Sequence, residues 1–336
     1  FSLPPETAHE LAMESLKFGG HFGLPRLVAG TAVADPVELM DIKFPNRVGL
    51  AAGLDKNGDY IDALGQLGFG HIEVGTVTPQ PQPGNPQPRM FRVKPAEAII
   101  NRMGFNNLGV DHLVERLAAR RYSGPVGANI GKQKETPVER AVDDYRVCLQ
   151  KVYPHCDYVA INVSSPNTEN LRQLQGTGAL AELLAELVDT RARLDQQHGV
   201  HRPIVVKIAP DWVPDRNGSA LRASLEAIGD SGINGLIATN TTVERDAVAG
   251  MPHADEAGGL SGRPLLEPSN RVLAAAREVL GEGFPIIGCG GVMTPDDARA
   301  KFRAGADLVQ IYTGFIYHGP ALVRAAAEAL EHEAAQ

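Results

Sequence analysis

The sequence predicts an α/β fold, a (β/α)8 TIM barrel with a short N-terminal helical extension. Eight short apolar runs alternate with longer amphipathic segments along the 336-residue chain, and such alternation is typical of parallel sheets with crossover helices. The runs show little polar alternation, as in Ile204-Val205-Val206, which is typical of strands covered on both faces. No Gly-x-Gly-x-x-Gly motif follows the first run, so an open doubly wound sheet is the second choice.

The expected strands are short and spread over the whole chain. They are residues 47–52, 71–75, 126–130, 158–163, 204–208, 235–239, 285–288 and 308–312. Between them, apolar residues recur at helical spacing. The expected helices are residues 60–67, 138–152, 180–194, 221–228, 270–280 and 320–330. The pairs Thr294-Pro295 and Thr136-Pro137 indicate helix starts, because threonine caps a helix and proline suits its first position.

Three segments do not fit the strand–helix repeat. The first is residues 1–41, whose apolar positions fall on one helical face, namely Ala8, Leu11, Ala12, Ser15 and Leu16. We therefore expect an extension over residues 1–41 and a barrel over residues 42–336. The other two are residues 79–106 and 241–268, and insertions of this size after barrel strands usually build the mouth of the active site.

Composition argues against a nucleic-acid-binding protein, a zinc protein and a membrane-spanning protein. The net charge is −8, whereas a protein that binds nucleic acid would be expected to carry a basic patch. The three cysteines, Cys148, Cys156 and Cys289, match no zinc-binding spacing and are expected to be reduced. No apolar stretch approaches the roughly 18 residues of a membrane span. We therefore expect neither nucleic acid nor a metal ion as a partner.

Two lysines lie at the carboxyl ends of expected strands, where a barrel has its active site. Lys56 follows the small residues Ala51-Ala52-Gly53, and Lys207 lies inside an apolar run. Because a buried lysine is almost never unpaired, Lys207 is expected to stabilise a negative charge, such as a reduced flavin or an enolate, rather than a core carboxylate. For Lys56, contact with an anionic substrate and a solvated surface position are equally good interpretations.

Amide and hydroxyl side chains gather at the same strand ends. They occur in the motifs Asn101 to Asn107, Asn129-Ile130-Gly131 and Asn162-Val163-Ser164-Ser165-Pro166-Asn167. Any one asparagine is more simply a turn residue, but the cluster can bind a planar polar molecule through donors and acceptors. Ser165 lies between amides and is expected to transfer a proton if its surroundings are dry. No nucleophile elbow indicates an acylating serine.

Glycine-rich loops follow the seventh and eighth expected strands. They are Gly288-Cys289-Gly290-Gly291 and Tyr312-Thr313-Gly314. Loops at these two places form the usual phosphate site of a barrel, so a phosphorylated cofactor or substrate is expected. The residues suit a flavin enzyme, and a phosphate-binding isomerase or lyase without flavin stays open as an alternative.

A series of motifs in order along the chain resembles the dihydroorotate dehydrogenase family. The motifs are residues 49–56, 73–79, 101–106, 161–167, 207–210, 240–242, 258–263 and 312–314. The resemblance implies FMN at the barrel mouth and oxidation of dihydroorotate to orotate in pyrimidine biosynthesis. It also implies that Ser165 is the base that removes the C5 proton while a hydride leaves C6 for the flavin.

The resemblance implies two overlapping sets of binding residues. The set that would hold FMN is Ala52, Gly53, Leu54, Asp55, Lys56, Thr76, Asn129, Asn162, Lys207, Thr239, Gly262, Gly291, Tyr312 and Thr313. The set that would contact the substrate is Lys56, Asn101, Arg102, Met103, Gly104, Phe105, Asn162, Asn167, Asn240 and Thr241.

Within that family the chain is most similar to the quinone-linked class. Members linked to fumarate or NAD use a cysteine as the base, where this chain has Ser165, and the quinone-linked class carries an N-terminal helical extension that residues 1–27 fit. His9 and Arg92 resemble the quinone-site histidine and arginine of that class. The resemblance implies a membrane quinone as partner. An amphipathic helix pair would lie on a membrane surface and let the quinone reach the flavin, so we expect a peripheral location on the cytoplasmic face of the cell membrane. An FMN barrel for another reduced pyrimidine and a non-catalytic membrane module stay open.

Overall fold

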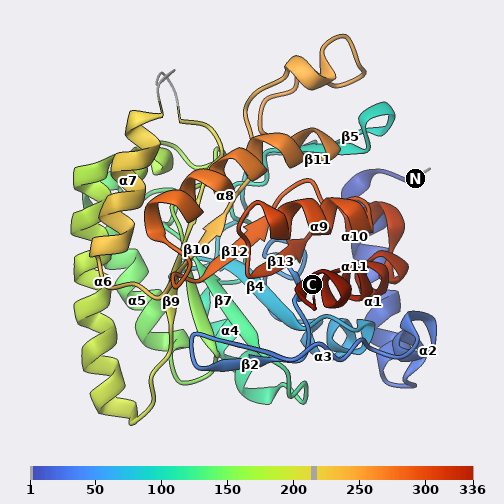
Figure 1. The fold of residues 1–336 in the computed structure, drawn as a ribbon, viewed down its shortest axis with the longest axis horizontal. Coiled ribbons are helices and arrows are strands. Elements are labelled where there is room, and N and C mark those ends of the chain that lie inside the picture. Colours follow the sequence, from blue (N-terminus) through green and yellow to red (C-terminus); the bar gives the residue numbers. More distant parts are fainter. Residues whose placement is uncertain (1–2, 213–217, 336) are drawn as a thin grey trace.

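The computed structural model describes residues 3–212 and 218–335. Eight parallel strands close into a barrel (Figure 1), and the ladder closes where the last strand pairs with the first. In chain order the strands are β3 (Val48–Leu50), β4 (His71–Val77), β7 (Val126–Ile130), β8 (Tyr158–Asn162), β9 (Ile204–Ile208), β10 (Gly235–Ala238), β12 (Ile286–Cys289) and β13 (Leu308–Ile311). Each corresponds to one of the eight expected strands, so the predicted barrel is confirmed.

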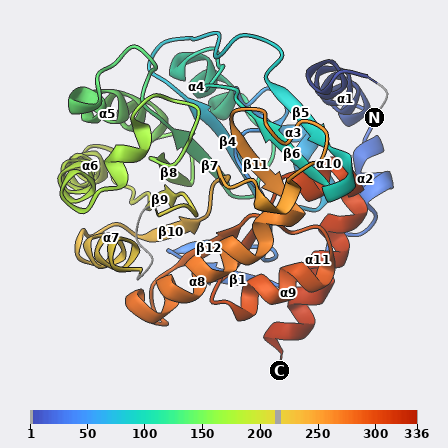
Figure 2. The same cartoon turned by 90° about the horizontal axis from the view of Figure 1, so that it is seen from above.

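Helices surround the strands, as the view from above shows (Figure 2). They are α3 (Ile61–Leu64), α4 (Val110–Ala119), α5 (Ala141–Val152), α6 (Thr177–His198), α7 (Ser219–Asp230), α8 (Leu266–Leu280), α9 (Pro295–Arg303), α10 (Thr313–His318) and α11 (Pro320–Ala334). Short 3-10 turns occur at Gly65–Leu67, Lys94–Ala96, Val138–Arg140, Leu171–Gln175, Asp246–Val248 and Arg263–Leu265.

The two expected helix starts have different outcomes. Thr294 caps α9, since its hydroxyl accepts a hydrogen bond from the Asp297 N–H at 3.2 Å while the Asp297 carboxylate accepts one from the Thr294 N–H at 2.8 Å. The helix expected over residues 138–152 is present as the 3-10 turn Val138–Arg140 followed directly by α5, but Thr136 does not cap it. The Thr136 carbonyl instead accepts a hydrogen bond from the Lys132 ammonium, which holds this backbone in the preceding loop.

The two inserted segments pair with each other above the barrel. Strands β5 (Met90–Val93), β6 (Ala98–Asn101) and β11 (Gly259–Gly262) form an antiparallel sheet in the order β11-β6-β5. The register pairs Asn101 with Gly259. This sheet therefore brings residues from both insertions to the barrel mouth.

A hairpin of β1 (Val37–Leu39) and β2 (Ile42–Phe44) packs at the amino ends of the barrel strands. Phe44 is 1% exposed and meets the ring of His71 edge-on, with 5.3 Å between the ring centroids. The boundary expected after Asp41 falls at the tip of this hairpin. The hairpin therefore packs with the barrel rather than with the helices that precede it.

The N-terminal extension forms α1 (Pro5–Gly20) and α2 (Leu24–Ala29), which lie beside the barrel against α3, α11 and β5. Met13 and Ala29 are the apolar side chains that it buries in the core. Among the described residues ten large apolar side chains are exposed, and seven of them belong to this segment, namely Leu3, Leu11, Phe18, Phe22, Leu24, Leu27 and Val28. Leu11, Ala12 and Ser15 of the expected helical stripe are exposed, so much of that stripe faces away from the barrel.

Candidate active site

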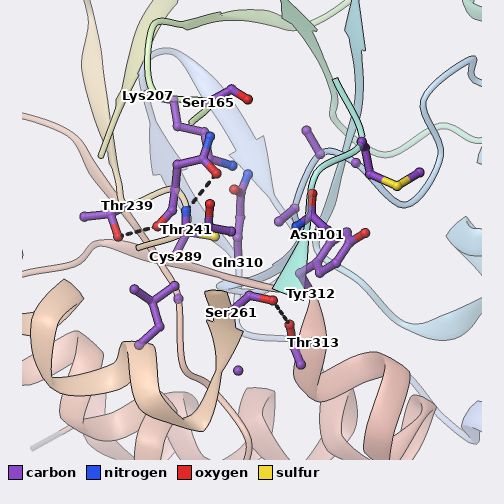
Figure 3. Close-up of a pocket in the computed structure, with 18 of the residues that line it drawn as sticks. Asn101, Ser165, Lys207, Thr239, Thr241, Ser261, Cys289, Gln310, Tyr312 and Thr313 are labelled. Atoms are coloured by element: carbon purple, nitrogen blue, oxygen red, sulfur yellow. Dashed lines mark hydrogen bonds between the residues drawn. The ribbon is translucent and has the colours of Figure 1, made fainter. Parts of the chain in front are cut away.

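A cavity of about 980 Å³ opens at the carboxyl ends of the strands. It contains most of the residues that the sequence predicted to bind ligands (Figure 3). Those residues are Ala52, Gly53, Lys56, Thr76, Asn101, Met103, Gly104, Phe105, Asn162, Ser165, Asn167, Lys207, Thr239, Asn240, Thr241, Gly262, Gly291, Tyr312 and Thr313. The closed barrel thus brings together residues from seven of the eight strand ends and from both insertions.

Four expected binding residues do not line this cavity. Leu54 is buried in the core, and the Asp55 carboxylate accepts hydrogen bonds from the N–H groups of Asp59 and Tyr60. Burial raises the pKa of Asp55 to about 6, and the carboxylate serves the turn after β3. Asn129 lies beneath the cavity floor, where its side chain is fully buried.

Arg102 is the fourth, and its side chain is engaged outside the cavity lining. Its guanidinium forms a 2.6 Å ion pair with Glu256 and stacks 4.6 Å from the ring centroid of Phe91. It also donates to the Pro88 carbonyl at 2.9 Å. These contacts hold the side chain in the outer sheet instead of the cavity.

The cavity floor contains a hydrogen-bonded chain that starts at a buried carboxylate. Glu73, on β4, accepts hydrogen bonds from Asn129 Nδ2 at 2.8 Å, Tyr158 Oη at 3.0 Å and Gln310 Nε2 at 2.9 Å. Because Glu73 accepts in all three bonds, the amide NH2 of Asn129 points toward it. Asn129 Oδ1 then accepts from Thr76 Oγ1 at 2.5 Å and from Asn162 Nδ2 at 3.3 Å. Glu73 therefore orients the amides on which bound ligands would rest.

Ser165 lies in dry surroundings at the end of β8. It is 5% exposed, and its hydroxyl oxygen accepts a 3.2 Å hydrogen bond from the Asn167 N–H. Asn167 in turn donates to Asn101 Oδ1 at 3.3 Å. A hydroxyl has two acceptor lone pairs, so one stays available toward the cavity. Within the described residues, the Ser165 hydroxyl forms no hydrogen bond with a histidine or a carboxylate.

Two lysines give the cavity a positive character. Burial and the neighbouring Arg89 cation lower the pKa of Lys56 to about 8. Lys207 is 5% exposed, and no hydrogen bond or ion pair of its ammonium is recorded within the described residues. The hydroxyl oxygen of Thr241 is likewise buried without a partner in that part of the chain. Because unpaired buried polar groups are costly, these side chains are suited to a polar, anionic ligand.

The opposite end of the cavity is a cradle of backbone. Gly290 and Gly291 have φ of 114° and 83°, and a Cβ on Gly291 would lie 2.3 Å from the backbone of Leu266. The N–H groups of Gly291 and Val292 donate no backbone hydrogen bond within the described ranges. Thr313 lies beside this loop, because a Cβ on the next residue, Gly314, would lie 2.1 Å from the Val292 carbonyl oxygen. Thr313 Oγ1 donates to Ser261 Oγ at 2.8 Å (Figure 3). Backbone amides at a glycine loop, with hydroxyls beside them, suit a phosphate group.

Nine further residues line the cavity that were not predicted as ligand contacts. They are Ala51, Ser261, Leu265, Cys289, Gly290, Val292, Met293, Gln310 and Gly314. Most are direct neighbours of the predicted glycine loops, so their positions were available from the sequence. Gln310 had a different signal, because it is a polar residue inside an otherwise apolar strand.

A second cavity of about 730 Å³ lies between α1 and the barrel and includes His9. Lys56, Met103 and Tyr312 line both cavities and so form the wall between them. Burial, helped by the Lys56 cation, lowers the pKa of His9 to about 4. Arg92 does not line this cavity, and its guanidinium donates a 2.8 Å hydrogen bond to the Leu3 carbonyl. The two expected quinone-site residues thus lie on adjoining elements, α1 and β5.

The described part of the chain has neither a cluster of metal-binding side chains nor a helix that could span a membrane. No group of three or more His, Cys, Asp or Glu side chains is arranged to hold a metal ion there. Nor is any described helix both long and apolar enough to span a membrane.

Comparison with known proteins shows which family the sequence matches. Residues 36–333 match the family model described as dihydroorotate dehydrogenase. A protein of Azotobacter vinelandii named dihydroorotate dehydrogenase (quinone) is 55% identical over 98% of this chain and 94% of its own length. A protein of Pseudomonas fluorescens with the same name is 54% identical over 98% and 96%.

Solved structures agree with the sequence comparisons. The crystal structure of DHODH from Eimeria tenella in complex with ferulenol has a TM-score of 0.85 and 34% identity, over 97% of this chain and 90% of that chain. The ligand-free form from the same organism has a TM-score of 0.84 and 36% identity, over 97% and 94%.

Proposed function

The chain belongs to the dihydroorotate dehydrogenase family, and on that premise we propose that it oxidises dihydroorotate to orotate with FMN and a membrane quinone as electron acceptors. This reaction serves pyrimidine biosynthesis. The observation that carries the proposal is the cavity at the barrel mouth, which joins Ser165, Lys56 and Lys207 to a glycine cradle. A dry proton acceptor, two cations and a phosphate site are together what this reaction needs.

FMN fits the two ends of the cavity. The phosphate would be held by the amides of Gly291 and Val292 and by the hydroxyls of Ser261 and Thr313, which already face one another. The ring system would lie toward the other group of expected residues, Thr76, Asn129, Lys207 and Thr239, with Asn129 acting from beneath. FMN, when bound, supplies the hydride-accepting chemistry. Lys207 provides the charge that offsets negative charge on the cofactor.

Dihydroorotate would occupy the part of the cavity nearest Ser165. Its carboxylate would pair with Lys56, and its ring donors and acceptors would match the amides of Asn101, Asn167 and Asn240. Ser165 Oγ would take the C5 proton on the lone pair that Asn167 leaves free, while its own hydroxyl proton would pass to solvent at the cavity mouth. Ser165 is 5% exposed, so few water molecules would reach it once the substrate is bound.

The extension would bring the quinone to the site. Its exposed apolar side chains would rest on the cytoplasmic face of the cell membrane as a peripheral contact. A quinone would then enter the cavity between α1 and the barrel, with His9 and Arg92 near its path. The shared wall of Lys56, Met103 and Tyr312 would separate it from FMN by one layer of side chains.

Anaerobic addition of dihydroorotate to the purified protein, followed by visible absorbance, tests the proposal. The flavin band is expected to bleach, and a quinone analogue added afterwards is expected to restore it. A flavin band that does not bleach would contradict the substrate. If no flavin band appeared even after FMN was added, a phosphate-binding barrel enzyme without flavin would be the better interpretation.

A further inference from the structure

Lys301 is a buried cation for which the proposed reaction has no role. It lies on α9, is 0% exposed, and its ammonium donates to Ser269 Oγ and Asn270 Oδ1, both at 2.8 Å. Both partners are neutral side chains of α8. A buried charge without an ion pair is costly, so a neighbouring anion is needed to explain why a lysine stands here.

The ammonium is connected to the glycine cradle through one side chain. Ser269 Oγ lies 3.1 Å from the Gly290 carbonyl and 2.9 Å from the Leu266 carbonyl. Gly290 belongs to the cavity lining, and Leu266 begins α8. Lys301 therefore joins α9, the first turn of α8 and the loop after β12 in one hydrogen-bonded unit.

The aliphatic stem of Lys301 packs closely against the end of β12. A Cβ added to Gly288 would lie 2.7 Å from Lys301 Cγ, so the strand can reach the stem only because residue 288 is a glycine. The lysine thus lies on the outer side of the strand whose following loop faces the cavity. Its charge is separated from the cradle by the backbone of that loop.

Within the described residues, no carboxylate forms an ion pair with Lys301, whose ammonium donates to two neutral side chains. Asp297 on α9, Glu267 on α8 and the Cys289 thiol on β12 favour the ammonium, but burial dominates and lowers the pKa of Lys301 to about 7. The Asp297 carboxylate is already bound by the N–H groups of Met293 and Thr294. A phosphate dianion in the cradle would supply the missing negative charge.

We propose that Lys301 is a positioning residue for the cofactor phosphate, which holds the Gly290–Gly291 loop against α8 through Ser269 and places a positive charge behind the cradle. The inference rests on the proposed function, since it takes FMN as the cofactor. It predicts that Lys301 distinguishes a phosphorylated flavin from an unphosphorylated one.

Riboflavin provides the test, because it has the ring system of FMN and lacks the phosphate. The Kd of each flavin would be measured by fluorescence titration of flavin-free wild-type protein and of Lys301→Met, which keeps the length of the side chain and removes its charge. We expect the FMN affinity to fall by about tenfold or more, since a charge at short range inside a protein is weakly screened. The riboflavin affinity is expected to change by less than about twofold, because the electrostatic attraction that is lost acts on the phosphate, which riboflavin lacks.

Lys132→Met is the matched control. Lys132 is 2% exposed and its ammonium donates to the backbone carbonyls of Gln133 and Thr136, away from the cradle. Its removal is expected to leave the ratio of the two affinities unchanged. Equal weakening of both flavins by Lys301→Met, or no weakening of FMN, would overturn the proposal.

A second variant tests the proposed role of Lys301 if Lys301→Met does not fold. Ser269→Ala keeps the cation and removes the connecting hydroxyl, and it is expected to weaken FMN several-fold more than riboflavin. An unchanged ratio in this variant would also overturn the proposal. Failure of the wild-type protein to bind FMN would instead contradict the proposed function, so the two failures are distinguishable.

Discussion

The barrel mouth and the N-terminal extension depart from the usual distribution of polarity in opposite directions. The mouth buries charged side chains, with Glu73 at 0% and Lys207 at 5% exposure, whereas the extension exposes Phe18 at 69% and Leu27 at 78%. Buried charges and exposed apolar patches are both costly in an isolated protein. This contrast is the reason for proposing a different partner for each region, an anionic ligand in the mouth and an apolar phase at the extension.

The two regions meet at one wall. Lys56, Met103 and Tyr312 face the polar cavity on one side and the cavity under α1 on the other. Dihydroorotate and quinone differ greatly in polarity, so an enzyme that uses both needs two separate entrances. The predictions below separate the two regions experimentally.

Ser165→Ala should have the largest effect and should act on the mouth alone. Loss of a general base is expected to slow flavin reduction by dihydroorotate roughly 10²–10⁴-fold, while FMN stays bound. Anaerobic stopped-flow absorbance measures the reduction rate. Reduction at the wild-type rate would remove Ser165 from the mechanism.

Deleting residues 1–30 should act on the other region. Quinone turnover is expected to fall roughly 100-fold or more, because the exposed apolar side chains, at about 1.5–3 kcal/mol for each one buried, would be lost from membrane and quinone contact. Flavin reduction by dihydroorotate should survive within a few-fold. Turnover with a quinone analogue in vesicles is compared with single-turnover reduction, and surviving quinone turnover would show that the extension is not the quinone site.

The pH dependence of substrate capture should report on Lys56. The cationic form binds the anionic substrate, and the pKa of Lys56 is lowered to about 8. The value of kcat/KM, which follows the free enzyme, should therefore be level below pH 8 and fall up to about tenfold per pH unit above it. In Lys56→Met, kcat/KM should be low and should lose this decline. A decline that persisted in the variant would have to be assigned to another group.

Phe18→Ser combined with Leu27→Ser should give the smallest effect and refine the deletion. Both side chains are largely exposed, so the fold should be unchanged. The affinity for vesicles is expected to fall about tenfold, because a side chain that only partly inserts at a membrane surface gains less than the roughly 1.5–3 kcal/mol of full burial. Vesicle co-sedimentation measures the binding. Val147→Ser with Val243→Ser is the matched control, since these exposed residues lie outside the extension. Equal loss in both double variants would contradict a membrane contact centred on α1 and α2.

The order of strands and helices could be predicted from the sequence because each element has its own local pattern of apolar and polar residues. The run Ile204-Val205-Val206 lies in a barrel strand that is buried along its whole length, and Thr294-Pro295 begins a helix with both reciprocal hydrogen bonds of its cap. The position of the cavity followed from the same patterns. Once eight strands are parallel and closed, their carboxyl ends and the residues that follow must converge.

What only the tertiary structure decided is the partner of each polar side chain. Glu73 and Gln310 are 237 residues apart in sequence and become hydrogen-bonded across the barrel interior, and Lys301 meets Ser269 from the neighbouring helix. Arg102 was expected at the substrate because its neighbours in the motif are there, yet Glu256, 154 residues away, holds it outside. Periodicity along a chain determines which face a residue occupies. The choice of partner depends on distances across the closed barrel, which no local pattern records.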